Sequence, residues 1–69
     1  MMYIQELFVK ARPQEDANTF TVHNELGLTQ SFNTYHNARD FYQSLHFPGI
    51  LYQESPSREI IHCKVYLEV

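Results

Sequence analysis

The sequence has few of the residues that mark several protein classes. Its 69 residues include one cysteine, two glycines, three prolines and no tryptophan. A single cysteine excludes an internal disulfide framework, so nothing marks an oxidising compartment. No stretch approaches the roughly 18 apolar residues that a membrane-spanning helix needs, and the first residues lack the basic head and apolar run of a secretory signal. These absences exclude a disulfide scaffold and a membrane span, and they predict a soluble cytoplasmic protein.

Charge is also scarce, and it is mainly acidic. Charged residues make up 19% of the chain, and eight acids against five Lys and Arg leave a formal net charge of −3. This balance argues against nonspecific nucleic-acid binding, which depends on clustered basic residues that neutralise phosphates. At 8.2 kDa the chain forms one small core at most, because a domain of this size buries only about 60% of its unfolded surface. Ten aromatic rings supply part of that core.

Alternating apolar residues predict a β-hairpin over residues 19–32. Phe20 and Val22 alternate with polar residues in its first arm. The Asn-Glu-Leu-Gly segment at 24–27 suits a type I turn followed by a left-handed glycine, which is a common hairpin connection. This turn places Phe20 opposite Phe32. A slip of one residue would expose both Phe rings, so the apolar pattern determines the register.

Residues 34–46 have the spacing of an amphipathic helix. Its apolar residues fall at the i, i+3, i+4 and i+7 positions of one stripe: Ala38, Phe41, Tyr42 and Leu45. Asn33 or Thr34 can accept backbone N–H bonds as the N-cap. The Pro48-Gly49 pair ends the helix, since proline cannot continue the hydrogen-bond ladder. We expect the stripe to cover the face of the first hairpin that carries the two Phe rings.

The C-terminal segment alternates strictly and predicts a second hairpin, with its turn at 55–58 around Pro56. Pairing across this turn places one apolar set toward the helix: Ile50, Tyr52, Ile61, Cys63, Val65 and Leu67. The same pairing leaves Leu51 and Ile60 facing the other way.

The first strand, expected at 3–10, carries apolar side chains on both faces. Tyr3, Leu7 and Val9 mark one face, and Ile4 and Phe8 mark the other. If the first three face the helix, Ile4 and Phe8 need another cover. We therefore expect this strand at the centre of the sheet or at a subunit interface.

In chain order these elements predict a single compact α+β domain over residues 1–69. The expected architecture is βββαββ, with a small antiparallel or mixed sheet of about five strands and one helix packed on one face.

Candidates for catalysis or metal binding are few and scattered. Cys63 shares a strand face with apolar residues, where a free cysteine behaves as a small hydrophobic residue, while His62 points to the opposite face. The four His show no pair with the tight spacing of a zinc site, and His36 with Asp40 is only a weak metal signal. We expect a structural cysteine, solvated histidines, no metal, no cofactor and no enzymatic activity.

Polar residues of both hairpins are expected to share the uncovered sheet face: Thr21, His23, Thr29, Ser31, His62, Lys64 and Tyr66. A basic residue beside an aromatic ring is typical of surfaces that bind single-stranded nucleic acid. Glu68 in the same row and the acidic net charge count against that function. Nucleic-acid binding by this polar face is therefore the alternative function.

The segment that leads into the helix is similar to parts of two known families. The matching residues cover about a fifth of the chain: Phe32, Thr34, Ala38, Phe41 and Leu45. The segment resembles the sheet-type arm-binding domain at the N-terminus of phage-type tyrosine recombinases. It also resembles the antitoxin domain of bicistronic mRNA-interferase toxin–antitoxin systems. Both resemblances imply nucleic-acid binding by a sheet face.

The main functional prediction is a small non-enzymatic module that binds a protein partner or a second copy of itself. Four apolar residues form the expected interface: Ile4, Phe8, Leu51 and Ile60. Monomers seldom expose large apolar patches, and burial of these four in a two-fold interface would also protect a strand edge. We therefore expect a homodimer without membrane contact.

Overall fold

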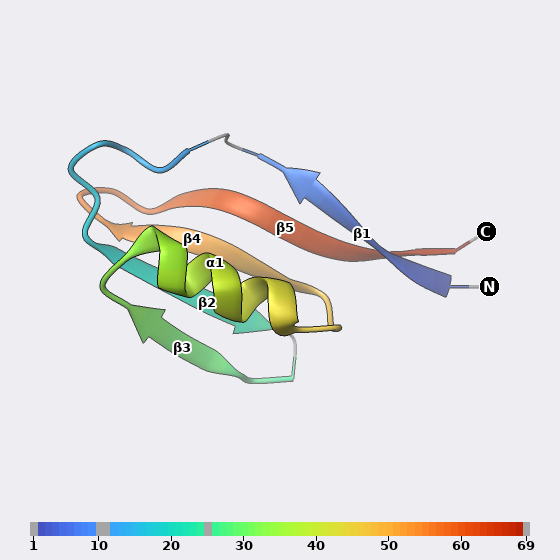
Figure 1. The fold of residues 1–69 in the computed structure, drawn as a ribbon. Helices are drawn as coiled ribbons and strands as arrows, with labels where there is room; N and C mark the ends of the chain where they lie inside the picture. Colours follow the sequence, from blue (N-terminus) through green and yellow to red (C-terminus); the bar gives the residue numbers. More distant parts are fainter. Residues whose placement is uncertain (1, 10–11, 25, 69) are drawn as a thin grey trace.

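The fold is one antiparallel sheet with a single helix on one face, seen in a computed structural model that describes residues 2–9, 12–24 and 26–68. At Met2 and Phe8 only the backbone is described. The elements are β1 (Met2–Phe8), β2 (Thr19–Asn24), β3 (Thr29–Phe32), α1 (Tyr35–Ser44), β4 (Gly49–Ser55) and β5 (Glu59–Glu68). Within these residues the sheet has the order β1-β5-β4-β2-β3, and every neighbouring pair is antiparallel. The predicted βββαββ fold class is confirmed (Figure 1).

The β2–β3 hairpin has the predicted register. Phe20 pairs with Phe32, and Gly27 adopts the left-handed φ of 93° that the turn requires. The side chain of Asn24 stabilises the turn, because its Oδ1 accepts hydrogen bonds from the backbone N–H groups of Leu26 and Leu28 at 2.9 and 3.0 Å. Turn and apolar pattern therefore specify the same hairpin.

Helix α1 begins and ends close to the predicted positions. Thr34 is the N-cap, and its side chain accepts a hydrogen bond from the backbone N–H of Asn37 at 3.2 Å. The helix packs on β2, β3 and β4, and the pair β1–β5 continues beyond it (Figure 1). Its stripe buries Ala38 and Tyr42 and partly buries Phe41 and Leu45, as predicted. The helix thus covers only part of one sheet face.

The β4–β5 hairpin has the predicted turn but the opposite orientation. Leu51, which the sequence pattern placed away from the helix, has no exposed surface and packs in the core beside Val22, its partner on β2. Ile50 pairs with Cys63 as predicted, so both turn to the face without the helix. A bulge between Leu51 and Tyr52 then shifts the pairing. Tyr52 therefore lies opposite Ile60 rather than Ile61, and Ile61 joins the core.

Strand β1 lies at the edge of the sheet next to β5, and not at its centre. Glu6 pairs with Lys64, whose side chain reaches the helix, so Glu6 and Ile4 belong to the helix side. Tyr3 and Leu7 belong to the other side, where they are 47% and 42% exposed. The predicted orientation of this strand is therefore also reversed.

Candidate protein interface on the open sheet face

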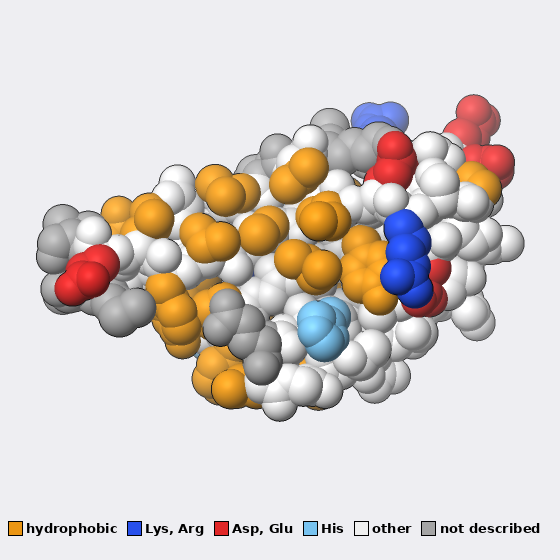
Figure 2. Space-filling view, turned by 180° about the vertical axis from the view of Figure 1, so that it is seen from behind, with side chains coloured by type: hydrophobic (Ala, Val, Ile, Leu, Met, Phe, Trp, Pro, Cys, Tyr) orange, Lys and Arg blue, Asp and Glu red, His pale blue; other side chains and the backbone are white. Residues whose placement is uncertain are grey.

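The sheet face opposite α1, here called the open face, carries most of the apolar residues of β1, β4 and β5 that the sequence pattern placed toward the helix. Register and strand alternation place these residues on it: Tyr3 and Leu7 from β1, Ile60, Cys63, Val65 and Leu67 from β5, and Ile50 and Tyr52 from β4. They are exposed or half-buried. Figure 2 shows hydrophobic side chains spread across the middle of this face, with one basic side chain toward one end. Helix α1 covers none of this surface.

A polar row borders the apolar residues along β2 and β3. Its side chains bond in cross-strand pairs, with Thr21 Oγ1 3.0 Å from Ser31 Oγ and His23 Nδ1 2.8 Å from Thr29 Oγ1. The sequence predicted that these four residues share the uncovered face, and the structure brings them together. Because each of these side chains has a hydrogen-bond partner, the row forms a polar border of the open face.

The other three residues of the predicted polar face lie on the helix side. His62 is 4% exposed and packs under α1. The Lys64 ammonium donates hydrogen bonds to the carbonyl oxygens of Tyr42 and Leu45, at 2.6 and 2.9 Å. There the positive charge stabilises the C-terminal end of the helix. Tyr66 follows on the same side of β5, so the seven predicted residues do not form one platform.

The predicted interface residues are also separated. Ile60 lies on the open face and is 43% exposed. Leu51 is a core residue, and Ile4 is half-buried on the helix side. The side chain of Phe8 lies outside the described residues. An apolar uncovered face exists, but Ile50, Tyr52 and Val65 form it in place of Leu51 and Ile4.

Cys63 is a free, half-buried cysteine on the open face. The prediction that it lies in the core is therefore wrong. It pairs with Leu7 on one side and Ile50 on the other, which places it in the middle of the apolar residues. Its strict alternation with Val65 and Leu67 is a correct signal of an apolar face. That alternation carries no information on which side the helix packs.

A cluster of ionisable residues lies between β1, β5 and α1. The Nε2 atom of His62 is 2.6 Å from the hydroxyl of Tyr35, and its Nδ1 is 3.8 Å from a carboxylate oxygen of Glu6. The imidazole also stacks on Tyr42, with ring centroids 5.8 Å apart, and the Lys64 ammonium lies 4.3 Å from the Tyr42 ring centroid. The cluster joins the edge strand to the helix.

Burial controls the ionisation of this cluster. It lowers the pKa of His62 below 6.5, an effect that Glu6 opposes and Arg39 reinforces. Burial likewise lowers the pKa of Lys64, again against the attraction of Glu6. The pKa of Tyr42 is raised by burial and by the neighbouring Glu6 carboxylate. The buried imidazole is therefore neutral at neutral pH.

We expect the free energy of unfolding to decrease as the pH falls below about 6.5. Unfolded His62 binds a proton near that pH, whereas folded His62 binds one only at lower pH. Protons therefore favour the unfolded state in this window, with a slope of at most about 1.4 kcal/mol per pH unit from one group. Urea unfolding at several pH values measures this slope, and His62→Gln should flatten it. Equal slopes for both proteins would contradict the assignment.

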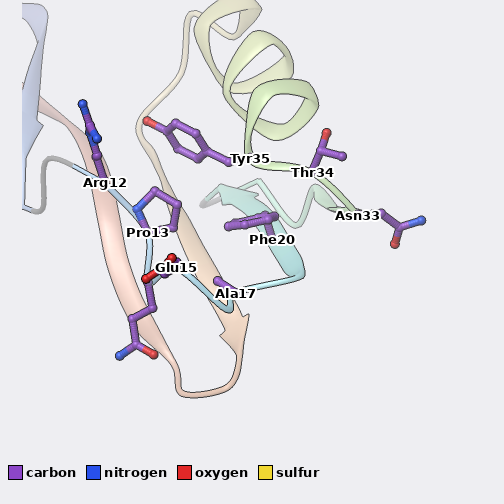
Figure 3. Close-up of a pocket in the computed structure, with 9 residues that line it drawn as sticks. Arg12, Pro13, Glu15, Ala17, Phe20, Asn33, Thr34 and Tyr35 are labelled. Carbon is purple, nitrogen blue, oxygen red and sulfur yellow. The ribbon is translucent and has the colours of Figure 1, made fainter.

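Several hollows indent the surface of the described residues. The first, of about 540 Å³, lies between residues 12–17 and the start of α1. Figure 3 shows the rings of Tyr35 and Phe20 on its helix side and Arg12 across from them. The buried Gln53 holds this loop, because its Oε1 accepts a hydrogen bond from the backbone N–H of Gln14 at 2.8 Å.

The second hollow, of about 480 Å³, lies on the open face. It is lined by His23, Thr29, Ile50, Tyr52, Arg58, Glu59 and Ile60. Its apolar floor continues the apolar residues of the face, and Arg58 lies at its edge just before β5 begins. This hollow is therefore part of the same candidate interface.

No grouping of three metal-ligating side chains occurs among the described residues. His36 and Asp40 form only an exposed pair, 3.2 Å apart on the helix surface. Of the described helical residues, none belongs to a helix with the length and apolar character required to cross a membrane.

Compared with known proteins, the chain matches no family model, no curated protein and no solved structure. The resemblances to recombinase arm-binding and antitoxin domains thus remain resemblances.

Proposed function

We propose that this protein is a small non-enzymatic binding module that contacts a protein partner through the open face. One observation carries the proposal: apolar side chains follow three adjacent strands, β1, β5 and β4, on the sheet face that the helix does not cover. Contiguous apolar patches on soluble proteins mark binding surfaces, because their contact with water is unfavourable.

The arrangement of the face fits protein binding. Its apolar centre is bordered by the hydroxyl and imidazole groups of β2 and β3, which resembles the apolar core and polar rim of protein interfaces. Tyr52 and the hollow beside it provide an aromatic group and a concave site, and both are common where binding energy concentrates.

Two neighbouring residues of β5 provide a matched test. Val65 is half-buried on the open face, and Tyr66 is 48% exposed on the helix side. Val65→Glu places a carboxylate within the proposed interface, where losing water is costly, whereas Tyr66→Glu places the same carboxylate outside it. We expect the first variant to lose partner binding and the second to retain it.

The measurement is affinity capture from cells that produce the protein, with wild-type chain and both variants immobilised side by side. Circular dichroism first establishes that both variants are folded. Proteins held by wild type and Tyr66→Glu but released by Val65→Glu support the proposal. Identical capture by the two variants would contradict it.

A further inference from the structure

We infer that the open face binds a second copy of this chain, stacked sheet against sheet. The inference rests on the proposed function and names the partner. Three properties of the face carry it: its size, its charge and the position of its centre.

The size of the face matches what a stable dimer needs. The molecule measures 40 × 21 × 17 Å, and the sheet extends along its broad side (Figure 1). The rectangle of 40 by 21 Å that encloses this side has an area of about 840 Å², which is an upper limit for the flat area of the open face. Stable protein interfaces remove about 800 Å² from each partner. A dimer of standard size would therefore need nearly the whole face, and one copy centred on it would leave little room for another partner.

The charge of the face is compatible with its own copy. The whole chain carries a formal net charge of −3, so two copies repel each other over much of their surfaces. In the described part of β1, β4 and β5, the middle of the open face has no Lys, Arg, Asp or Glu. The charged residues near the β4–β5 turn differ in sign: Glu54 lies on β4, and Arg58 and Glu59 line the hollow. Another acidic side chain lies at the opposite end of the face, away from its centre (Figure 2). Two such neutral centres can meet without like-charge repulsion.

A second copy also supplies the layer that the sheet lacks. Among the side chains that the structure describes, six apolar ones form the buried core: Phe20, Val22, Ala38, Tyr42, Leu51 and Ile61. A core of this size is small for a domain, and association is a common way to stabilise such chains. Apolar sheet faces stack about 10 Å apart with aligned strands, which makes a second core between them. The resulting dimer has its helices outside and its two sheets inside.

The centre of the face locates the two-fold axis. Cys63 lies midway along β5 and between Leu7 and Ile50 on the neighbouring strands. In a symmetric dimer both copies use the same patch, so the overlap that buries most of it is centred near this residue. The two thiols then project toward each other from backbones about 10 Å apart.

The first measurement is the molar mass by light scattering at high micromolar concentration. We expect about twice the chain mass of 8.2 kDa. Val65→Glu should raise the dissociation constant at least tenfold, because each dimer would bury two carboxylates, while Tyr66→Glu should remain dimeric. A monomeric wild-type chain overturns the inference. If Val65→Glu still loses a captured protein in that case, the proposed function stands with a different partner.

The second measurement uses the single cysteine as a probe of position. A short bifunctional thiol reagent should join two wild-type chains through Cys63, and Val65→Glu should reduce the yield at least tenfold. Cys63→Ser should prevent cross-linking and keep the dimer mass, which shows that the reagent reports on an existing dimer. A dimer that resists cross-linking and tolerates Val65→Glu associates through another surface, and that result overturns the inference.

Discussion

Leu51→Ala is expected to lower the free energy of unfolding by about 2–5 kcal/mol, the usual cost of truncating a buried leucine. Leu51 has no exposed surface and packs with Val22 beneath the helix. A chain of 69 residues has a total stability of roughly 3–10 kcal/mol. The variant therefore loses a large part of its stability, and urea unfolding followed by circular dichroism measures the loss.

Ile50→Ala is the matched control for this prediction. Ile50 precedes Leu51 on β4 but lies half-buried on the open face. Its truncation should cost less in the monomeric protein, because the new side chain leaves no enclosed cavity. In the monomeric Val65→Glu background, an equal or larger loss at Ile50 than at Leu51 would mean that the other side of β4 faces the helix.

Tyr42→Ala is expected to cost about 3–5 kcal/mol, as for other buried aromatic residues. The ring is 1% exposed and contacts two residues of β5, by stacking on His62 and lying beneath the Lys64 ammonium. Truncation removes these contacts together with the apolar area that joins the helix to the sheet. The loss is measured by urea unfolding at neutral pH, where His62 is uncharged.

Tyr42→Phe separates the ring from the hydroxyl. The phenyl ring keeps the stacking on His62 and the packing against the core, so this variant should retain most of the stability. Phe41→Ala provides a second comparison, because Phe41 is only partly buried against the core and should cost less. Similar losses at Phe41 and Tyr42 would contradict the difference in burial between the two rings.

Local signals were sufficient for the elements of this fold. Asn24 and Gly27 specify one turn, the Phe20–Phe32 pair specifies its register, and Thr34 with Pro48 limits the helix. Each of these features depends on residues close together in the chain. These features could therefore be predicted from the sequence without knowledge of the tertiary structure.

The sequence predicted what kind of surface the candidate site is, but not all of the residues that form it. The sequence pattern predicted an uncovered apolar face, and the open face is apolar. It is formed by Ile50, Tyr52 and Val65 rather than by Leu51 and Ile4. The four polar residues of the first hairpin were placed correctly because that hairpin was oriented by its two Phe rings. His62 and Lys64 were misplaced together with their strand.

The sequence by itself determined the five strands, the helix, the turns and the register of the β2–β3 hairpin, since these depend on neighbouring residues. Only the tertiary structure decided which side of β4 and β5 meets the helix. Strands whose two faces are both partly apolar satisfy local patterns in either orientation. The pairing of Val22 with Leu51 removes this ambiguity, because β2 already presents Val22 to the helix. That contact between distant segments turned Cys63, Val65 and Leu67 outward and created the open face.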